Sequence, residues 1–279
     1  MVTNPDRVAG RGLRERLSPI KTAATAAGVE VLQPARAREP EFQERFEKLQ
    51  PDIACVVAYG KILPPALLEV PPLGFVNAHF SLLPAYRGAA PIQWSLIKGD
   101  RVTGISIMVL TEGMDEGPLL AQVSTGVEPL DTAASLGGRL AALAAPLLLD
   151  TVNSYAAGRV APRPQGERGV SYAPKLMADD VRIDWSLSAH EVHNLTRGAN
   201  PEPGAWTTYR GTRMKILEST VADEPVLPPG TMELTRGGLF VGCRQGALLI
   251  GIAQMQGKRP LGGADLARGL HLQPGDRLE

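Results

Sequence analysis

The chain has 279 residues, of which 44% are hydrophobic and 21% are charged. This composition is typical of a globular protein that buries a large core, and it excludes a disordered chain, a collagen and a mini-protein scaffold. Lysine plus arginine equals aspartate plus glutamate at 29 each, so no overall charge would hold the protein on nucleic acid or on an anionic membrane. Any such contact must therefore be local.

Cysteine usage and hydropathy predict a cytoplasmic protein. Cys55 and Cys243 are isolated thiols without ligand spacing, which argues against a disulfide framework and against a cysteine zinc site. The longest apolar run, residues 140–149, is far shorter than the roughly 20 residues needed to span a bilayer, and we expect it in a core-facing helix. The N-terminus lacks a signal-peptide core.

Strands and helices alternate along the first half of the chain, which predicts an open α/β sheet. The apolar run at 53–58 is typical of a parallel strand buried on both faces. We expect the other strands at 29–33, 74–80, 104–110 and 119–123. We expect helices at 18–27, 41–49, 89–98 and about 131–156.

The pattern changes after residue 158. Residues 159–177 are rich in Pro, Arg and Gly and have no periodicity, which predicts a linker. Helices are expected at 188–197 and 264–270, and short strands at 205–209, 214–218, 230–234, 239–242 and 247–254. Five short strands separated by Gly and Pro turns predict a small β-barrel, for which the OB type is a natural candidate.

Two histidines in the expected helix at 188–197 have the spacing of metal ligands. His190 and His193 stand three residues apart, but the sequence offers no third ligand near them. We therefore expect a solvated helix face there and no metal site.

The most informative segment is the expected strand at 74–80 and the loop that follows it. Alternate side chains of a strand share a face, so Asn77 and His79 point the same way. They stand at the end of the strand, where open α/β sheets bind their ligands. The alternative is that both side chains only satisfy buried loop backbone.

Two further loops follow expected strands. Residues 111–117 (TEGMDEG) combine glycines, which allow close approach to a ligand, with three carboxylates. Spacing does not choose among Glu112, Asp115 and Glu116, and a solvated acidic turn would have the same pattern. Residues 57–64 (VAYGKILP) join a strand to a loop, and a plain βα connection explains them equally well.

Several motifs together resemble a known family. They are Asn-x-His-x-Ser-Leu-Leu-Pro at 77–84, Gly-x-Asp at 113–115, VAYG at 57–60, YRGAAPIQ at 86–93, YAPK at 172–175 and IDWS at 183–186. In this order they are similar to the 10-formyltetrahydrofolate-dependent formyltransferases, and among these to the methionyl-tRNA formyltransferases. The resemblance runs from about residue 2 to the C-terminus.

The resemblance implies a domain organisation. It implies a Rossmann-like, mostly parallel catalytic domain at 1–158, a linker at 159–177 and an OB-like tRNA-binding domain at 178–279. Family members begin with a strand, a turn and a helix, and this sequence starts at what corresponds to the end of the second strand. We expect the first βα unit to be absent, through a misassigned start codon or a truncation, and the sheet to be less stable because an edge is exposed.

The resemblance also implies the substrates and the residues that bind them. The donor would be 10-formyltetrahydrofolate and the acceptor initiator methionyl-tRNA, with no metal, no membrane and a monomeric chain. The implied catalytic residues are Asn77, His79 and Asp115. The implied folate contacts are Ile62, Leu63, Ser81, Leu82, Leu83 and Pro84. The implied tRNA contacts are Arg7, Arg11, Arg14 and Lys21, from a segment in which residues 1–21 hold five basic and two acidic side chains.

Two other functions fit the same residues. The chain could be an inactive remnant that only binds folate or tRNA, because intact motifs do not prove an assembled sheet. It could also be a related formyltransferase that acts on another amine, although the region after residue 177 argues against a one-domain enzyme of nucleotide metabolism.

Overall fold

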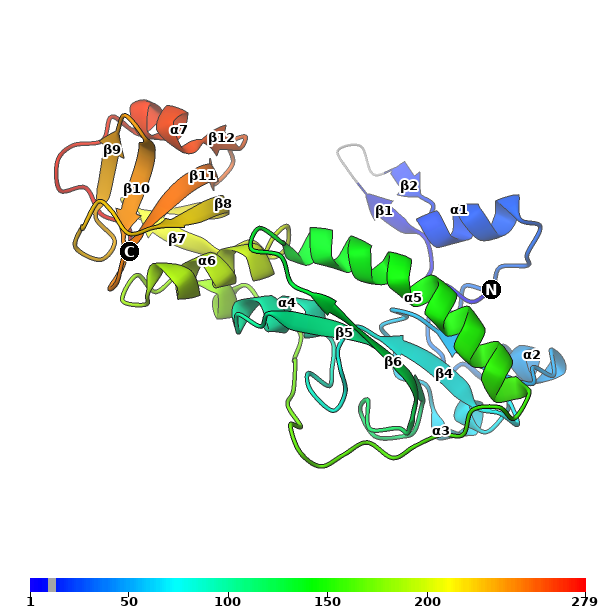
Figure 1. Ribbon diagram of the computed structural model, residues 1–279. Helices are drawn as coiled ribbons and strands as arrows, with labels where there is room; N and C mark the ends of the chain where they lie inside the picture. Colours follow the sequence, from blue (N-terminus) through cyan, green and yellow to red (C-terminus); the bar gives the residue numbers. More distant parts are fainter. Residues whose placement is uncertain (10–13) are drawn as a thin grey trace. The chain divides into compact units, whose positions relative to one another are not determined.

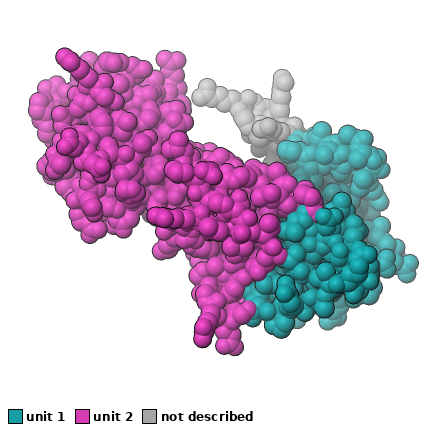
Figure 2. Space-filling model, viewed as in Figure 1, with its two compact units in different colours: residues 1–79, 107–121, 147–165 teal, residues 80–106, 122–146, 166–279 magenta. Residues whose placement is uncertain are grey.

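The computed structural model describes residues 1–9 and 14–279 (Figure 1). Two compact units make up the chain (Figure 2). The first unit comprises residues 1–79, 107–121 and 147–165, and the second comprises 80–106, 122–146 and 166–279.

The N-terminal segment forms two short strands and two helices. Strands β1 (Arg7–Ala9) and β2 (Arg14–Arg16) pair antiparallel. Helix α1 (Pro19–Ala26) begins after Ser18, whose side chain accepts a hydrogen bond from the Lys21 backbone, as the Ser-Pro sequence favours. Helix α2 (Pro40–Lys48) follows. The expected strand at 29–33 is reduced to a parallel bridge between Leu32 and Val2.

The four-stranded sheet has the strand order β3-β4-β5-β6. Its strands are β3 (Ala54–Val56), β4 (Phe75–His79), β5 (Val102–Val109) and β6 (Leu119–Gly126). Strand β3 runs parallel to β4. The prediction that the apolar run at 53–58 is buried on both faces is wrong, because Cys55 and Val57 are exposed. The physical reason is that β3 is the end strand of the sheet, a property that depends on non-local pairing.

A small aromatic cluster packs against β4. Phe46 on α2 stacks on Phe75 of β4 with 5.7 Å between ring centroids, and Phe42 adds a tilted contact to Phe46. Leu67 on the short helix α3 (Pro65–Leu68) is buried in the same cluster. Helix α2 therefore buries its apolar face against the strand that carries Asn77 and His79.

The longest helix, α5 (Ala133–Ala156), is core-facing on one side only. Leu140 and Ala144 are buried, whereas Leu143 and Leu149 are 37% and 62% exposed, which corrects the expectation of a wholly core-facing run. Among the described helices, α5 alone has the length and apolar composition that could cross a membrane, with 22% of that stretch buried. A single such helix is weak evidence, because helices of soluble proteins pass the same test.

Helices α4 (Pro91–Ile97) and α6 (Ala189–Gly198) pack together in the second unit. Ser188 and Glu191 form a capping box that fixes the start of α6. A Cβ on Gly198 would lie 2.6 Å from the Ile97 side chain and 2.9 Å from the Gln93 carbonyl, so only glycine allows the two helices to approach this closely.

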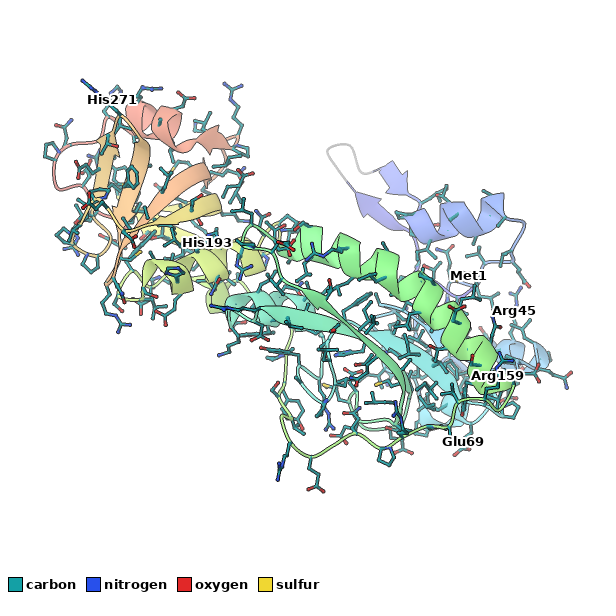
Figure 3. All side chains as sticks on the ribbon, viewed as in Figure 1. Met1, Arg45, Glu69, Arg159, His193 and His271 are labelled. Carbon is teal, nitrogen blue, oxygen red and sulfur yellow. The ribbon has the colours of Figure 1, made fainter. Side chains whose placement is uncertain are left out.

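His193 on α6 is not solvated as expected (Figure 3). Its ring nitrogens contact the Ser219 hydroxyl at 3.1 Å and the Pro129 carbonyl at 3.3 Å. Burial is the main cause that lowers the pKa of His193. The charges of Arg197 and His190 lower it further, whereas the two hydrogen bonds raise it. His190 is exposed, so the expectation of a solvated helix face holds for one histidine and is wrong for the other.

The second sheet is antiparallel, with the strand order β7-β8-β11-β10-β9 and β12 paired to β11 (Figure 1). Its strands are β7 (Trp206–Tyr209), β8 (Thr212–Ala222), β9 (Met232–Thr235), β10 (Gly238–Gly242), β11 (Ala247–Met255) and β12 (Leu261–Gly262). Register shifts near Ile252 interrupt the β8–β11 ladder. Helix α7 (Gly263–Leu270) and the 3₁₀ turn η1 (Asp179–Val181) complete this part of the chain.

The core of this sheet contains wholly buried aliphatic side chains, among them Ile216, Leu239 and Leu248. The Trp185 indole is also buried there and donates to the Thr207 hydroxyl, so its one polar atom is satisfied. The protein is thus a mixed α/β chain with a sheet that contains parallel strands, followed by a curled antiparallel sheet.

Candidate functional site

Strand β4 presents Asn77 and His79, as the alternation of side chains predicts. β4 lies between β3 and β5, so hydrogen-bonded neighbours on both sides fix its backbone. Asn77 is half-buried and opposite Val56 of β3, and His79 is 5% exposed. The amide and the imidazole therefore stand on a rigid element.

The loop between β5 and β6 brings a carboxylate to the histidine. Oδ2 of Asp115 lies 3.6 Å from Nδ1 of His79, and the two side chains are 16% and 6% exposed. The spacing of the sequence left Glu112, Asp115 and Glu116 open, and the fold places Asp115 beside the imidazole. The carboxylate can therefore orient the imidazole in a site that is largely shielded from water.

A residue that sequence reasoning missed contacts the same loop. The Gln165 side-chain amide donates to the backbone carbonyls of Asp115 and Gly117, each at 2.8 Å. Gln165 lies in a segment without periodicity, and no local signal in the sequence distinguishes it. Only the tertiary structure brings it to the loop.

The residues at 57–64 differ in their access to a ligand. Ile62 is 93% exposed, whereas Leu63 packs against the aromatic cluster beneath β4. Lys61 is held by the carbonyls of Pro34 and Ala35, at 2.9 and 2.8 Å. Ile62 is therefore the side chain of this loop that an apolar ligand could contact.

The hydroxyl of Tyr59 in the same loop is buried without a hydrogen-bond partner among the described residues. Burial, with a smaller effect of the Glu39 charge, raises the pKa of Tyr59. The hydroxyl therefore stays protonated and keeps a hydrogen to donate.

The segment at 81–84 is tied down by neighbouring strands. The Ser106 hydroxyl donates to the Ser81 carbonyl at 2.7 Å and accepts from the Leu83 backbone at 3.0 Å. Gln122 donates to the Leu83 carbonyl at 2.9 Å. Ser81 and Leu83 are buried, so of the four predicted contacts only Leu82 and Pro84 have partly exposed side chains.

The basic residues predicted near the N-terminus are only partly described. Arg7 lies on β1 and Arg14 on β2, with side chains outside the described part, and Arg11 lies outside the described residues altogether. Lys21 forms an ion pair with Asp6, whose pKa is lowered chiefly by that hydrogen bond. Of the four cations, Lys21 is thus the one engaged by an acidic neighbour in the described structure.

The antiparallel sheet carries cations around an aromatic ring. The Arg213 guanidinium lies 4.0 Å from the ring centroid of Trp206, and that of Arg182 lies 5.6 Å from it. The buried Nε of Arg213 has no hydrogen-bond partner in the described part of the chain. Arg213 and Lys215 also line a surface hollow of about 270 Å³ with Gln254. We name these four residues, Arg182, Trp206, Arg213 and Lys215, the basic–aromatic patch.

Neither metal chemistry nor a reactive cysteine is indicated by the described residues. They contain no cluster of three or more His, Cys, Asp or Glu side chains that could hold a metal ion. Burial raises the pKa of the Cys243 thiol to about 11, so it carries almost no thiolate at neutral pH.

Known families match both parts of the chain. Residues 1–152 match the family described as formyl transferase, and residues 175–271 match the formyl transferase C-terminal domain. The chain belongs to the formyl transferase family.

Relatives of similar length support the family assignment. The methionyl-tRNA formyltransferase of Streptomyces coelicolor is 44% identical over 279 residues, covering 100% of this chain and 90% of that protein. The protein of the same name from Mycobacteroides abscessus is 44% identical over 272 residues, covering 98% of this chain and 89% of that protein.

Solved structures share the fold at low identity. An N-formyltransferase from Helicobacter canadensis, solved with folinic acid and dTDP-3-aminofucose, has a TM-score of 0.67 at 18% identity and covers 91% of this chain and 87% of that chain. HypX from Aquifex aeolicus, solved with tetrahydrofolic acid, has a TM-score of 0.63 at 19% identity and covers 88% of this chain and 43% of that chain.

Proposed function

We propose that this chain transfers a formyl group from 10-formyltetrahydrofolate to the α-amino group of methionine on initiator tRNA. The observation that carries the chemistry is that Asp115 lies 3.6 Å from His79, which stands on the strand that also holds Asn77. The acceptor follows from the full-length similarity to proteins named methionyl-tRNA formyltransferase.

The reaction makes modest demands on the amine and larger ones on the formyl group. A free α-amino group has a pKa of about 7.7 to 8.0, so a useful fraction is neutral and nucleophilic at pH 7. As the amine attacks, negative charge develops on the formyl oxygen. A donor aimed at that oxygen is worth on the order of 10²- to 10³-fold in rate, and the Asn77 amide supplies a neutral one.

His79 and Asp115 handle the proton. His79 donates a proton to the developing negative charge or to the departing nitrogen of the donor, and Asp115 orients the imidazole for that transfer. The slight exposure of both side chains strengthens this interaction, because little water screens it.

The residues present fit a folate co-substrate. In the first unit, an apolar ring system can contact Ile62, which is almost wholly exposed. Leu82 and Pro84 of the second unit also have partly exposed apolar side chains. The Tyr59 hydroxyl, which has no hydrogen-bond partner among the described residues, offers a donor in the same loop as Ile62. We assign Ser81, Leu83 and Leu63 to the support of these loops, because Ser81 and Leu83 are buried and Leu63 packs against the core. Two relatives of the same fold were solved with folates.

For the tRNA we propose two contact regions. The first is the N-terminal segment with Arg7, Arg11 and Arg14, whose charges suit phosphate contacts. Lys21 joins this region only if the tRNA displaces its ion pair with Asp6. The second is the basic–aromatic patch, where the planar guanidinium of Arg213 lies over Trp206 and its buried Nε has no hydrogen-bond partner in the described part of the chain.

We propose a separate role for each successive segment of the chain. Residues 1–158 form the catalytic domain, 159–177 the linker and 178–279 a tRNA-binding domain of the OB type, a class of sheet that binds nucleic acids elsewhere. The short antiparallel strands of this sheet and its basic–aromatic patch support this assignment. We propose that the protein acts as a monomer in the cytoplasm, where charged tRNA is used.

The test is a direct assay of formyl transfer by the full chain. Purified protein is mixed with 10-formyltetrahydrofolate and initiator methionyl-tRNA, and formylmethionyl-tRNA is quantified after mild deacylation. Reactions with a nucleotide-linked amino sugar or with no acceptor measure transfer to another amine and hydrolysis of the donor. Transfer to methionyl-tRNA that greatly exceeds both is expected. Binding of tRNA and folate without turnover would instead identify an inactive remnant and overturn the proposal.

A further inference from the structure

The two partners of the proposed catalytic pair are held in different ways. His79 belongs to β4, whose backbone is fixed by strands on both sides. Asp115 belongs to the loop at 110–118 and has a φ of +51°, in the left-handed region that L-residues other than glycine rarely adopt. A carboxylate on such a backbone needs other contacts to keep its place.

Gln165 contacts the backbone at Asp115 and just after it. A primary amide has two N–H groups, and those of Gln165 reach the carbonyls of Asp115 and Gly117 at the same distance of 2.8 Å. These two carbonyls lie on either side of Glu116, so one side chain holds the loop at two points along its backbone.

The segment that carries Gln165 is itself anchored. Arg163 and Leu119 form an antiparallel bridge, with N–H···O distances of 2.7 and 2.8 Å. Residue 119 starts β6, so Gln165 extends from the same sheet that the loop leaves. The loop also rests directly on β5, because a Cβ on Gly117 would lie 1.7 Å from the Val109 carbonyl oxygen. The backbone that leads to Gln165 is thus held in place by β6.

We propose that Gln165 is a positioning residue for formyl transfer, which sets the backbone of Asp115 and so the separation between its carboxylate and His79. This inference rests on the catalytic roles proposed for His79 and Asp115. It gives a function to the end of the segment at 159–165, which sequence analysis assigned to a featureless linker.

The first test compares Gln165→Met with the unchanged chain. Methionine keeps an unbranched side chain of similar length and removes both donors. Because displacements of about 1 Å can cost about 100-fold in rate, we expect kcat to fall about 10- to 100-fold while the KM values for both substrates change little.

A double-mutant cycle with Asp115→Asn separates positioning from general damage. If Gln165 acts through Asp115, the double variant will be no slower than Asp115→Asn alone. Fully multiplicative losses would mean that Gln165 acts elsewhere and would overturn the inference. Gln273→Met is a matched control, because Gln273 also donates to a backbone carbonyl, that of His271, at an exposed position; its kcat should stay unchanged.

Folding and the proposed function are tested separately. Gln165→Glu keeps the shape of the side chain and also removes the donors, so it gives a second comparison if Gln165→Met unfolds at a lower temperature. Normal turnover in Asp115→Asn would refute the proposed catalytic pair. Loss of turnover in Asp115→Asn together with normal kcat in both Gln165 variants would refute only the positioning role.

Discussion

The two sheets of this protein differ in the side chains that they bury. In the antiparallel sheet, β8 and β11 pair along most of their length and cover wholly buried side chains such as Ile216 and Leu248. In the four-stranded sheet, Cys55 on the end strand β3 and Val57 just after it are exposed, and the buried positions include the titratable His79. Burial of a polar or charged group costs free energy unless it is paired. Both sheets bury aliphatic side chains, among them Ile105 of β5, so the difference lies in His79, the group to which we assign proton transfer.

The largest effect is expected from substitution of the polar groups at the four-stranded sheet. His79→Ala and Asp115→Asn should each lower kcat by at least about 100-fold, because general acid–base groups contribute about 10²- to 10⁴-fold. Folate binding, measured by fluorescence titration, should survive in both. His190→Ala is the matched control, because His190 is an exposed histidine on helix α6, next to the antiparallel sheet. Near-normal turnover in His79→Ala would assign the proton transfer to another group.

Substitution of an apolar residue in the antiparallel sheet and of one beside the four-stranded sheet should change the free energy of unfolding by different amounts. Ile216→Ala should lower the free energy of unfolding by about 2 to 5 kcal/mol, because it leaves a cavity in a wholly buried site. Val57→Ala, at 45% exposure beside the open edge, should change it by less than about 0.5 kcal/mol. Urea unfolding followed by circular dichroism measures both. Equal losses would mean that the exposed edge contributes as much packing as the antiparallel core.

Local signals in the sequence predicted most elements of the fold. Ser18 and Ser188 mark the starts of α1 and α6 as N-caps, and the strands of the antiparallel sheet lie close to their expected ranges. The exposure of β3 and the burial of His193 were not predictable in the same way. Both depend on which distant segment lies alongside, such as β8, which brings Ser219 to His193.

The candidate site was predictable only in part. The alternation along β4 placed Asn77 and His79 on one face, and family resemblance chose Asp115, which the fold brings to His79. Spacing alone did not separate Asp115 from its acidic neighbours, because which of them faces the imidazole depends on the conformation of the whole loop, in which Asp115 has a positive φ. Gln165 was invisible, since its role depends on two hydrogen bonds across about 50 residues of chain.

A smaller effect is expected from the basic–aromatic patch. Arg213→Ala should raise the KM for methionyl-tRNA several-fold, leave kcat unchanged and reduce the slope of log KM against log salt by about 1, as for the loss of one phosphate contact. Arg213→Lys should restore the salt slope but not the full affinity, because lysine lacks the planar group that lies on Trp206.

Arg268→Ala is the control for this measurement. Arg268 is exposed and pairs with Asp265 at 2.5 Å, outside the patch. An equal rise in KM in Arg213→Ala and Arg268→Ala would mean that the tRNA responds to overall charge, and the antiparallel sheet would then have no specific binding role.

The smallest expected effect is on the pH dependence of the free energy of unfolding, through His193, the half-buried histidine of α6. The pKa of His193 is lowered, chiefly by burial, whereas in the unfolded chain it lies near the ordinary value of about 6.5. As the pH falls below about 6.5, the unfolded chain takes up this proton before the folded chain does, so the free energy of unfolding decreases until the lower folded pKa is passed. His193→Gln should flatten this part of the stability curve, measured by urea unfolding between pH 5 and pH 8, while His190→Gln, at an exposed position, should leave it unchanged. An identical slope in the His193 variant and the original chain would place the pH-sensitive group elsewhere, and the antiparallel region would then carry no titrating side chain that affects its packing.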